Sequence, residues 1–308
     1  MPYGEPRPNE SPIDELKREL PNILVLAGLL LLLLILLTRF HWIHCSQVFK
    51  VGPIYQPTNW CQIYCDNFHG SKSKIAIVYG DSGIGDPNAL RARLKVERPF
   101  TEPVMLKLQD ISAMNLDFYD LVIVEHAKRL TLTQADAIAS FIKSGKAVLW
   151  IGDSGTEYYV PVSEQQEALR KNQTVPGYYE AYMNRVNFTI ATNFGPLATY
   201  LGVKAFNGTL SGSSNMKLDR ISSVNLITSG LADEVSFPAN SSGMQFANVE
   251  FDPVGGEQIF KIVIGDNEYP AIIERKAGRT ESLYVAFPLE NSPSKALITN
   301  IFDYIVLC

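Results

Sequence analysis

The sequence predicts a single-pass membrane protein whose globular part is a three-layer α/β domain with a mostly parallel sheet, preceded by one transmembrane helix. Three observations support this fold class. An uncharged apolar stretch near the N-terminus is long enough to span a bilayer. After residue 73, short apolar runs typical of buried strands alternate with helical patterns. Two of these runs stop at glycine-rich turns, as parallel strands in such a sheet do.

The composition is that of a folded protein. The chain has 308 residues, of which 46% are hydrophobic and 19% charged, and this balance excludes disorder throughout. The formal net charge of −5 provides no broad basic face for a phosphate backbone. We therefore expect no nucleic-acid partner.

The apolar stretch runs from Leu20 to Thr38 without a charge, between Glu19 and Arg39. A signal peptide is the alternative, but its apolar region is usually only about 7–15 residues long and ends at a small-residue cleavage site, which is missing here. Aromatic residues follow at positions 40 and 42 and suit the lipid–water interface. We expect an uncleaved transmembrane helix at residues 20–43, after a flexible tail at residues 1–19.

The orientation of this helix is predicted from glycosylation acceptors, because the basic residues on its two sides are nearly balanced. Four Asn-x-Ser/Thr patterns lie after the helix and favour an exported domain. We expect a cell-membrane protein with a cytoplasmic N-terminus and an extracytoplasmic C-terminal domain. The candidate acceptors are Asn172, Asn187, Asn207 and Asn240.

Residues 44–72 are expected to form a juxtamembrane stalk that contains three of the four cysteines. Disulfides are the first interpretation, because an oxidising compartment permits them, and free buried thiols are the second. A metal site that also uses His41, His44 and His69 ranks last, since the spacing matches no tight zinc motif. We predict no cofactor and no metal. The disulfide candidates are Cys45, Cys61, Cys65 and Cys308.

The domain at residues 73–308 begins with a repeated strand and helix pattern. A helix is expected from Thr133, with Asp136 as its capping partner, to Ser144, where Gly145 ends it. This order implies right-handed crossovers and a parallel sheet covered on both faces. The expected strands are Lys74–Tyr79, Val104–Leu108, Leu121–Glu125 and Ala147–Ile151.

An insertion at about residues 157–240 interrupts this rhythm and is expected to lie over the sheet, with one clear helix at Pro196–Leu201. Leu297, Ile301 and Ile305 then mark the apolar face of a closing helix. Four more strands are expected before it, at Phe246–Phe251, Ile259–Ile264, Tyr269–Glu274 and Ser282–Phe287.

Three polar turns are candidates for a site, because ligands of parallel sheets bind outside the carboxyl ends of the strands. The turn at residues 80–86 has glycines that suit an anion, but its aspartates and its lack of lysine favour a tight turn instead. The second turn holds Glu125 and His126, a candidate base or metal ligand or a structural histidine. The candidate ligand-binding residues are Asp81, Ser82, Glu125, His126, Asp153 and Ser154.

The third turn, at residues 152–155, offers the only candidate catalytic set. Ser154 could act as nucleophile, His126 as base and Asp153 as acid. The hydrolase elbow reads Gly-x-Ser-x-Gly, whereas Thr156 replaces the second glycine here. Hydrolysis is therefore the minority interpretation.

Residues 74–308 resemble the class I glutamine amidotransferase-like superfamily, which has a flavodoxin-like fold and includes trehalose-utilisation-type proteins. True amidotransferases place a cysteine after the strand that matches Ala147–Ile151 and a His-Glu pair near the C-terminus. This chain has neither the cysteine nor a histidine after His126, so the resemblance implies a member that has lost its catalytic residues. The resemblance rests on Tyr119–Val124, Leu132–Thr133, Ser144–Leu149, Tyr269–Ile273, Gly278–Arg279, Tyr284–Glu290 and Thr299–Tyr304.

The resulting functional hypothesis is a non-catalytic binding or scaffolding module for a glycan, peptide or protein partner outside the cytoplasm. The alternative is an enzyme, either a hydrolase that uses Ser154 and His126 or a metal-dependent enzyme that uses His126 and nearby carboxylates. A type II glycosyltransferase ranks last, because the chain has no Asp-x-Asp pair to hold a metal and a nucleotide.

Overall fold

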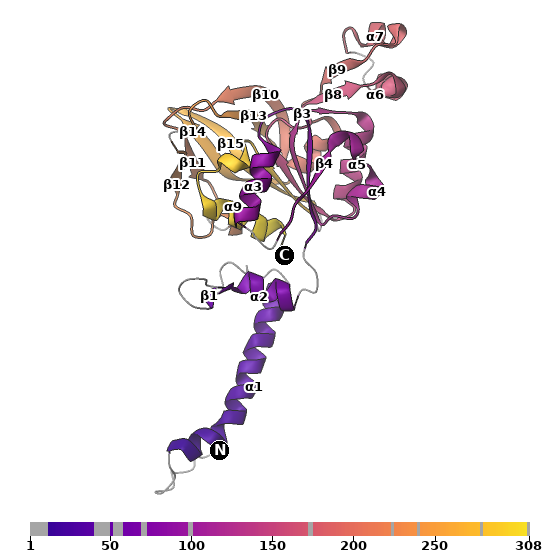
Figure 1. Cartoon of the computed structure of the whole chain (residues 1–308). Helices are drawn as coiled ribbons and strands as arrows, with labels where there is room; N and C mark the ends of the chain where they lie inside the picture. The colour runs from indigo at the N-terminus through magenta and orange to yellow at the C-terminus, as the bar shows by residue number, and fades with distance from the viewer. Residues whose placement is uncertain are drawn as a thin grey trace. The chain divides into compact units, whose positions relative to one another are not determined.

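The computed structural model describes residues 12–39, 50–51, 58–68, 73–97, 101–171, 175–222, 225–238, 241–277 and 280–306 (Figure 1). The chain divides into two compact units, Met1–Gly70 and Ser71–Cys308. Each unit is described by itself.

The N-terminal unit is built on the helix α1, Pro12–Arg39. Its segment Glu19–Thr38 has a mean hydropathy of 2.8 and is mostly exposed, so it is long and apolar enough to cross a membrane as a signal or an anchor. The helix begins inside the expected flexible tail of residues 1–19. Pro12 stands at the first helical position, where proline is favoured, and Pro21 lies within the helix.

A short helix, α2 at Trp60–Asn67, packs against the end of α1. The Trp60 indole donates a hydrogen bond of 2.9 Å to the Thr38 hydroxyl. The rings of Trp60, Tyr64 and Phe68 follow one another at helical spacing, with centroids 6.2 and 6.4 Å apart along the series. The hydrogen bond from Trp60 to Thr38 attaches α2 to the end of the apolar helix. The strands β1, Lys50–Val51, and β2, Thr58–Asn59, pair antiparallel in the same unit.

The predicted stalk lies partly outside the described residues. Cys61 and Cys65 lie one turn apart on the backbone of α2. Cys45 and Cys308 fall outside the described part of the chain, as do Asn172 and Asn240. The disulfides therefore stay a prediction.

The domain after residue 70 is built on one sheet of nine strands, in the order β12-β11-β14-β15-β16-β7-β5-β3-β4. Its core, from β16 to β4, is parallel, which confirms the predicted α/β class. The core strands are β3 Ile75–Ser82, β4 Val104–Lys107, β5 Leu121–Ala127, β7 Ala147–Ile151 and β16 Thr280–Val285.

The other half of the sheet is antiparallel, so the sheet is mixed rather than mostly parallel. Two of its strands, β11 and β12, come from the segment expected to lie over the sheet, and they extend its edge instead. Short polar strands at a sheet edge lack the buried apolar run that reveals a central strand. These strands are β11 Lys217–Arg220, β12 Glu234–Ser236, β14 Gly256–Ile264 and β15 Asn267–Ala277.

Helices cover both faces of the parallel core. Alternate residues of β3 point to opposite faces, so Ile75 and Ile77 join one apolar cluster while Ala76 and Val78 join the other. The first cluster contains α3, Pro87–Glu97, and α9, Lys295–Ile305. The second contains α4, Ala113–Leu116, and α5, Leu132–Lys143. This is the predicted three-layer arrangement.

The start of α5 differs from the prediction. The capping box is formed by Thr131 and Gln134, not by Thr133 and Asp136. The Gln134 side chain accepts a 2.8 Å hydrogen bond from the Thr131 amide. The Thr133 hydroxyl instead donates to Glu164 at 2.8 Å. Two threonines on either side of Leu132 give the same capping signal, and tertiary contacts decide between them.

The remaining elements surround this sheet. In Figure 1 a small excursion that contains β8, β9, α6 and α7 projects from one end of the domain. The helix α8, Ala198–Leu201, ends at Gly202 as predicted. These elements are β6 Arg129–Leu130, β8 Glu157–Val160, α6 Gln165–Lys171, α7 Tyr178–Asn184, β9 Phe188–Ala191, β10 Val203–Ser211 and β13 Gln245–Phe251. The 3-10 turns lie at Leu108–Asp110, Val162–Glu164, Gly195–Leu197, Leu226–Thr228 and Leu289–Asn291.

Candidate functional site

The three polar turns lie together at the carboxyl edge of the parallel core, because β3, β5 and β7 are adjacent in the sheet. The Ile84 amide donates to the Asp153 carboxylate at 2.7 Å, which ties the first turn to the third. The Ala127 amide donates to the Ser154 hydroxyl at 3.3 Å, which ties the second turn to the third. The polar side chains therefore hold the turns in place by hydrogen bonds.

Ser154 is sealed inside the protein. It has no exposed surface, and its carbonyl accepts a 2.6 Å hydrogen bond from the Trp150 indole. Asp153 is only 4% exposed. Among the described residues no hydrogen bond joins Ser154 to His126. A nucleophile also needs a path for the substrate, and the buried Ser154 side chain offers none in this structure.

His126 adopts an unusual backbone conformation at the end of β5. Its φ is +53°, in the left-handed region where histidine is uncommon. Its Nδ1 atom is buried and has no hydrogen-bond partner within the described ranges. No group of three His, Cys, Asp or Glu side chains that could hold a metal ion is found among the described residues. The interpretation of His126 as part of a metal-dependent enzyme gains no support from this arrangement.

A buried carboxyl group, Glu125, and a partly buried one, Glu290, lie close together at the first turn. Glu125 is fully buried, and in the described part of the chain neither of its carboxyl oxygens accepts a hydrogen bond from a donor. Glu290 enters from the loop after β16, and its Oε1 accepts a 2.8 Å hydrogen bond from the Asp86 amide. Burial first, and then the facing Glu290 carboxyl and Asp86, raise the pKa of Glu125 well above its usual range. Burial likewise raises the pKa of Glu290. Burial and the facing carboxyl group therefore both favour the protonated form of Glu125.

Gly85 closes the turn over this carboxyl pair. Its φ is +99°, and a Cβ atom there would lie 2.5 Å from Glu125 Oε1. Only glycine fits both the backbone conformation and the close approach. The interpretation of this segment as a tight turn agrees with this contact. Glu290 was outside the predicted site, because only the fold brings it back to a turn 204 residues earlier.

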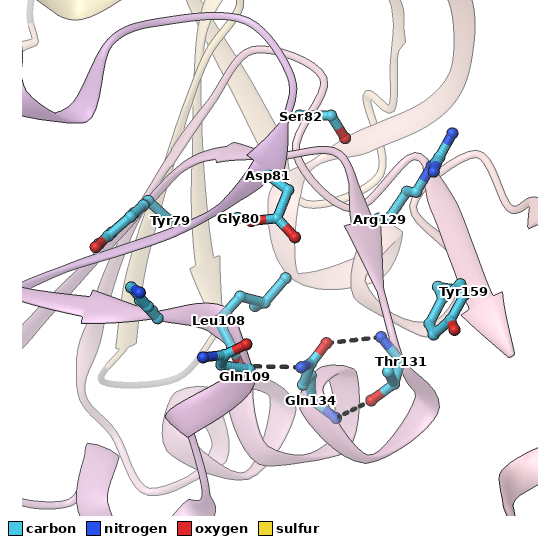
Figure 2. A pocket seen from close by; sticks show the side chains of 11 residues that line it. Tyr79, Gly80, Asp81, Ser82, Leu108, Gln109, Arg129, Thr131, Gln134 and Tyr159 are labelled. Atoms are coloured by element: carbon cyan, nitrogen blue, oxygen red, sulfur yellow. Dashed lines mark hydrogen bonds between the residues drawn. The ribbon is translucent and has the colours of Figure 1, made fainter. Parts of the chain in front are cut away.

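An open cleft lies on the other side of the same turn. It has a volume of about 560 Å³ and is lined by the end of β3, by the segment after β4, and by residues from β6, α5 and β8 (Figure 2). Of the six candidate ligand-binding residues, Asp81 and Ser82 line this cleft. The other lining residues are Tyr79, Gly80, Lys107, Leu108, Gln109, Arg129, Thr131, Gln134 and Tyr159.

A β-bulge directs Asp81 into the cleft. Tyr79 pairs with Glu125 and Ser82 with Ala127, so β3 uses three steps (79 to 82) where β5 uses two (125 to 127). One extra residue bends the strand and re-aims its side chains. Figure 2 shows the Asp81 carboxylate pointing into the cleft. Asp81 is exposed, and within the described ranges it has no ion pair or hydrogen bond through its side chain.

The floor of the cleft is held by its own hydrogen bonds. The Gln134 side chain donates to the Leu108 carbonyl at 2.9 Å and accepts from the Thr131 amide (Figure 2). At the rim, Arg129 Nε is 3.1 Å from the Glu157 carboxylate. Gln134, Thr131 and Arg129 therefore already have hydrogen-bond or ion-pair partners within the protein. In contrast, the Asp81 carboxylate remains open to a ligand.

Comparisons with known proteins place the fold. No protein-family model matches the sequence, and no curated protein sequence matches it. A ThuA-like protein from Bacteroides uniformis superposes with a TM-score of 0.51 at 12% identity, over 78% of this chain and 94% of that one. The fold is class I glutamine amidotransferase-like.

Two further solved structures resemble this chain. A cold-adapted β-galactosidase from Rahnella has a TM-score of 0.51 and 15% identity over 77% of the present chain. The match covers 32% of that enzyme, so the chain spans about a third of its length. A GMP synthase component from Thermoplasma acidophilum has a TM-score of 0.43 and 12% identity, over 76% of this chain and 94% of that one.

Replacing Ser154 with alanine is expected to destabilise this amidotransferase-like domain. The buried Ala127 amide would lose its acceptor, which costs about 1–3 kcal/mol. Denaturant unfolding of the full-length protein in lipid nanodiscs measures the loss. Ser140→Ala, on the exposed side of α5, is the control and is expected to change little. An unchanged midpoint for Ser154→Ala would mean that its hydroxyl does not hold the turn.

Proposed function

We propose that this chain displays a non-catalytic binding domain on the outer side of a membrane, held there by the N-terminal helix. The observation that carries the proposal is the contrast at the carboxyl edge of the sheet. Ser154, the candidate nucleophile, has no exposed surface and its hydroxyl is already hydrogen-bonded. Beside it, an open cleft of about 560 Å³ presents polar groups to solvent. A buried candidate nucleophile together with an open polar cleft supports ligand binding without catalysis.

The size and position of the cleft also support this role. Binding sites for small molecules are typically clefts of about 300–1,000 Å³, and in open α/β sheets they lie outside the carboxyl ends of the strands. The cleft meets both conditions. The hydrolase alternative is not favoured by any contact between Ser154 and His126 in the described chain.

The orientation across the membrane rests on the exposed apolar helix and on the acceptor asparagines. Asn187 and Asn207 are both exposed, before β9 and on β10, and could carry glycans if the domain is exported. Their modification remains a prediction. An outer-face location makes a ligand of the extracytoplasmic space the expected partner, which includes the glycan, peptide and protein classes.

The test is a ligand screen on the full-length protein in phosphatidylcholine nanodiscs, which avoids detergents with sugar headgroups. Neutral saccharides, acidic sugars, sugar phosphates and dipeptides are each added while the melting temperature Tm is measured. We expect at least one class to raise Tm with increasing concentration, by mass action on the folded state. The ligand is expected to be recovered chemically unchanged. Conversion of the ligand, or no shift with any class, would contradict the proposal.

The location is tested separately by protease treatment of intact cells that express the full-length chain with an N-terminal epitope. We expect external protease to digest the C-terminal domain while the epitope remains protected until the membrane is permeabilised. Protection of the domain in intact cells would place it in the cytoplasm.

A further inference from the structure

We propose that the ligand of the cleft is a neutral polyhydroxylated molecule, a saccharide, which Asp81 holds through hydrogen bonds to its hydroxyl groups. This inference rests on the proposed binding function and names the class of ligand. The cleft presents charges of both signs, hydrogen-bonding groups and aromatic rings.

The charged side chains that line the cleft are of both signs, so no single sign of ligand charge is complementary to all of them. Asp81 contributes one negative charge, whereas Lys107 and Arg129 contribute positive charges. Arg129 shares the Glu157 carboxylate with Lys128, and hydrogen bonds from Lys128 and then from Arg129 lower the pKa of Glu157. The remaining Asp81 and Lys107 offset each other. A phosphate group would meet the Asp81 carboxylate, which Figure 2 shows directed into the cleft.

The unengaged polar groups include both acceptors and donors. Asp81 offers two carboxylate oxygens, which can accept from two adjacent hydroxyl groups of one molecule. Lys107, the last residue of β4, and Gln109, in the turn that follows, are exposed and can donate. A molecule with many hydroxyl groups satisfies this mixture, because each hydroxyl both donates and accepts. An apolar ligand would leave these groups unpaired, at a cost for each.

Two tyrosines in the lining of the cleft also suit a saccharide. Tyr79 comes from β3 and Tyr159 from β8, and Figure 2 shows them on opposite sides of Asp81. Both are partly buried, so each presents an aromatic surface with a polar hydroxyl at its end. Sugar rings have apolar C–H faces between their hydroxyl groups, and such amphipathic surfaces suit them. The volume of about 560 Å³ leaves room for more than one sugar ring.

The experiment compares four compounds on the full-length protein in phosphatidylcholine nanodiscs: lactose, glucuronate, glucose 6-phosphate and the dipeptide Ala-Ala. We expect lactose to raise Tm at millimolar concentration and the other three to raise it less. Asp81→Ala should weaken lactose binding at least ten-fold in isothermal titration while leaving the unliganded Tm nearly unchanged, because Asp81 is exposed and unpaired among the described residues. Asp136→Ala, at an exposed position of α5, is the matched control and should bind like the parent protein.

The other outcomes separate the inference from the function. Preferential binding of glucuronate, glucose 6-phosphate or Ala-Ala would overturn the saccharide assignment and leave a binding domain in place. Lactose binding that survives both Asp81→Ala and Tyr159→Ala would move the site away from this cleft and overturn the inference as well. If none of the four compounds bound, while the wider screen also gave no shift, the binding function itself would fail.

Discussion

Replacing Glu125 with glutamine is expected to make the protein more stable, and increasingly so as the pH rises. Glu125 holds its proton to a higher pH in the folded protein than in the unfolded chain, where a glutamate titrates near pH 4.5. Between these two values unfolding releases a proton, so the free energy of unfolding falls as the pH rises. This loss of folding stability is absent below about pH 4.5. It is complete once the pH exceeds the pKa of Glu125 in the folded protein. Glutamine has nearly the same shape and no charge to bury.

The size of this effect follows from the linkage between proton binding and folding. Each pH unit between the two pKa values costs about 1.4 kcal/mol, and each kcal/mol shifts Tm by roughly 2–4 °C in a domain of this size. We therefore expect Glu125→Gln to exceed the parent Tm by several degrees at pH 8 and by little at pH 5. Glu290→Gln should act in the same direction, because it removes the facing carboxyl that helps to raise the pKa of Glu125.

The measurement is a series of thermal melts of the full-length protein between pH 4.5 and 9. Glu102→Gln is the control, since that carboxylate is 80% exposed and pairs only with Lys95 at 3.4 Å within the described chain. Its profile should follow that of the parent protein. If the Glu125→Gln and parent curves ran parallel at every pH, folding would not raise the pKa of Glu125, and this account of the carboxyl pair would be contradicted.

Replacing Trp150 with alanine is expected to have the largest destabilising effect of any substitution at the carboxyl edge. Trp150 is fully buried in the cluster between the sheet and α5. Its indole donates to the Ser154 carbonyl at 2.6 Å and so fixes the turn after β7. Truncating a buried tryptophan to alanine costs about 3–5 kcal/mol through lost burial and the cavity that remains. That is a large part of the stability of a typical domain.

The predicted result is a loss of that size in the denaturant unfolding of the full-length protein in nanodiscs. Trp150→Phe keeps most of the apolar volume and loses the indole hydrogen bond, so a smaller loss is expected. The difference between the two variants separates packing from the hydrogen bond. Equal and small losses in both would mean that the turn does not depend on this side chain.

Much of the fold could be predicted because its signals are local. The strands β3, β5 and β7 are continuous apolar runs, since both faces of each are buried. The last helix shows a regular apolar period, and Leu297, Ile301 and Ile305 are all in the core. The turns at Gly145 and Gly202 end helices in the left-handed conformation that glycine favours. For each of these elements, the residues of one short segment are enough to predict the local structure.

The parts that escaped prediction depend on distant segments. Strands β11 and β12 are short and polar, and only their pairing with β14 and with each other makes them part of the sheet. The cleft is assembled from segments near residues 80, 108, 130 and 159. Asp81 and Ser82 could be found because they follow a recognisable strand, whereas Tyr159 gave no signal of its own. Glu290 likewise reaches Glu125 only through the closed fold.

The most direct test of the account is hydrogen–deuterium exchange of the full-length protein in nanodiscs, with and without the compound that gives the largest Tm shift. We predict slower exchange in peptides that contain Tyr79–Ser82 and Lys107–Gln109, no change around the buried Ser154, and an unaltered compound at the end of the experiment. Protection centred on residues 152–156, or chemical conversion of the compound, would contradict the claim that this edge of the sheet binds its ligand without catalysis.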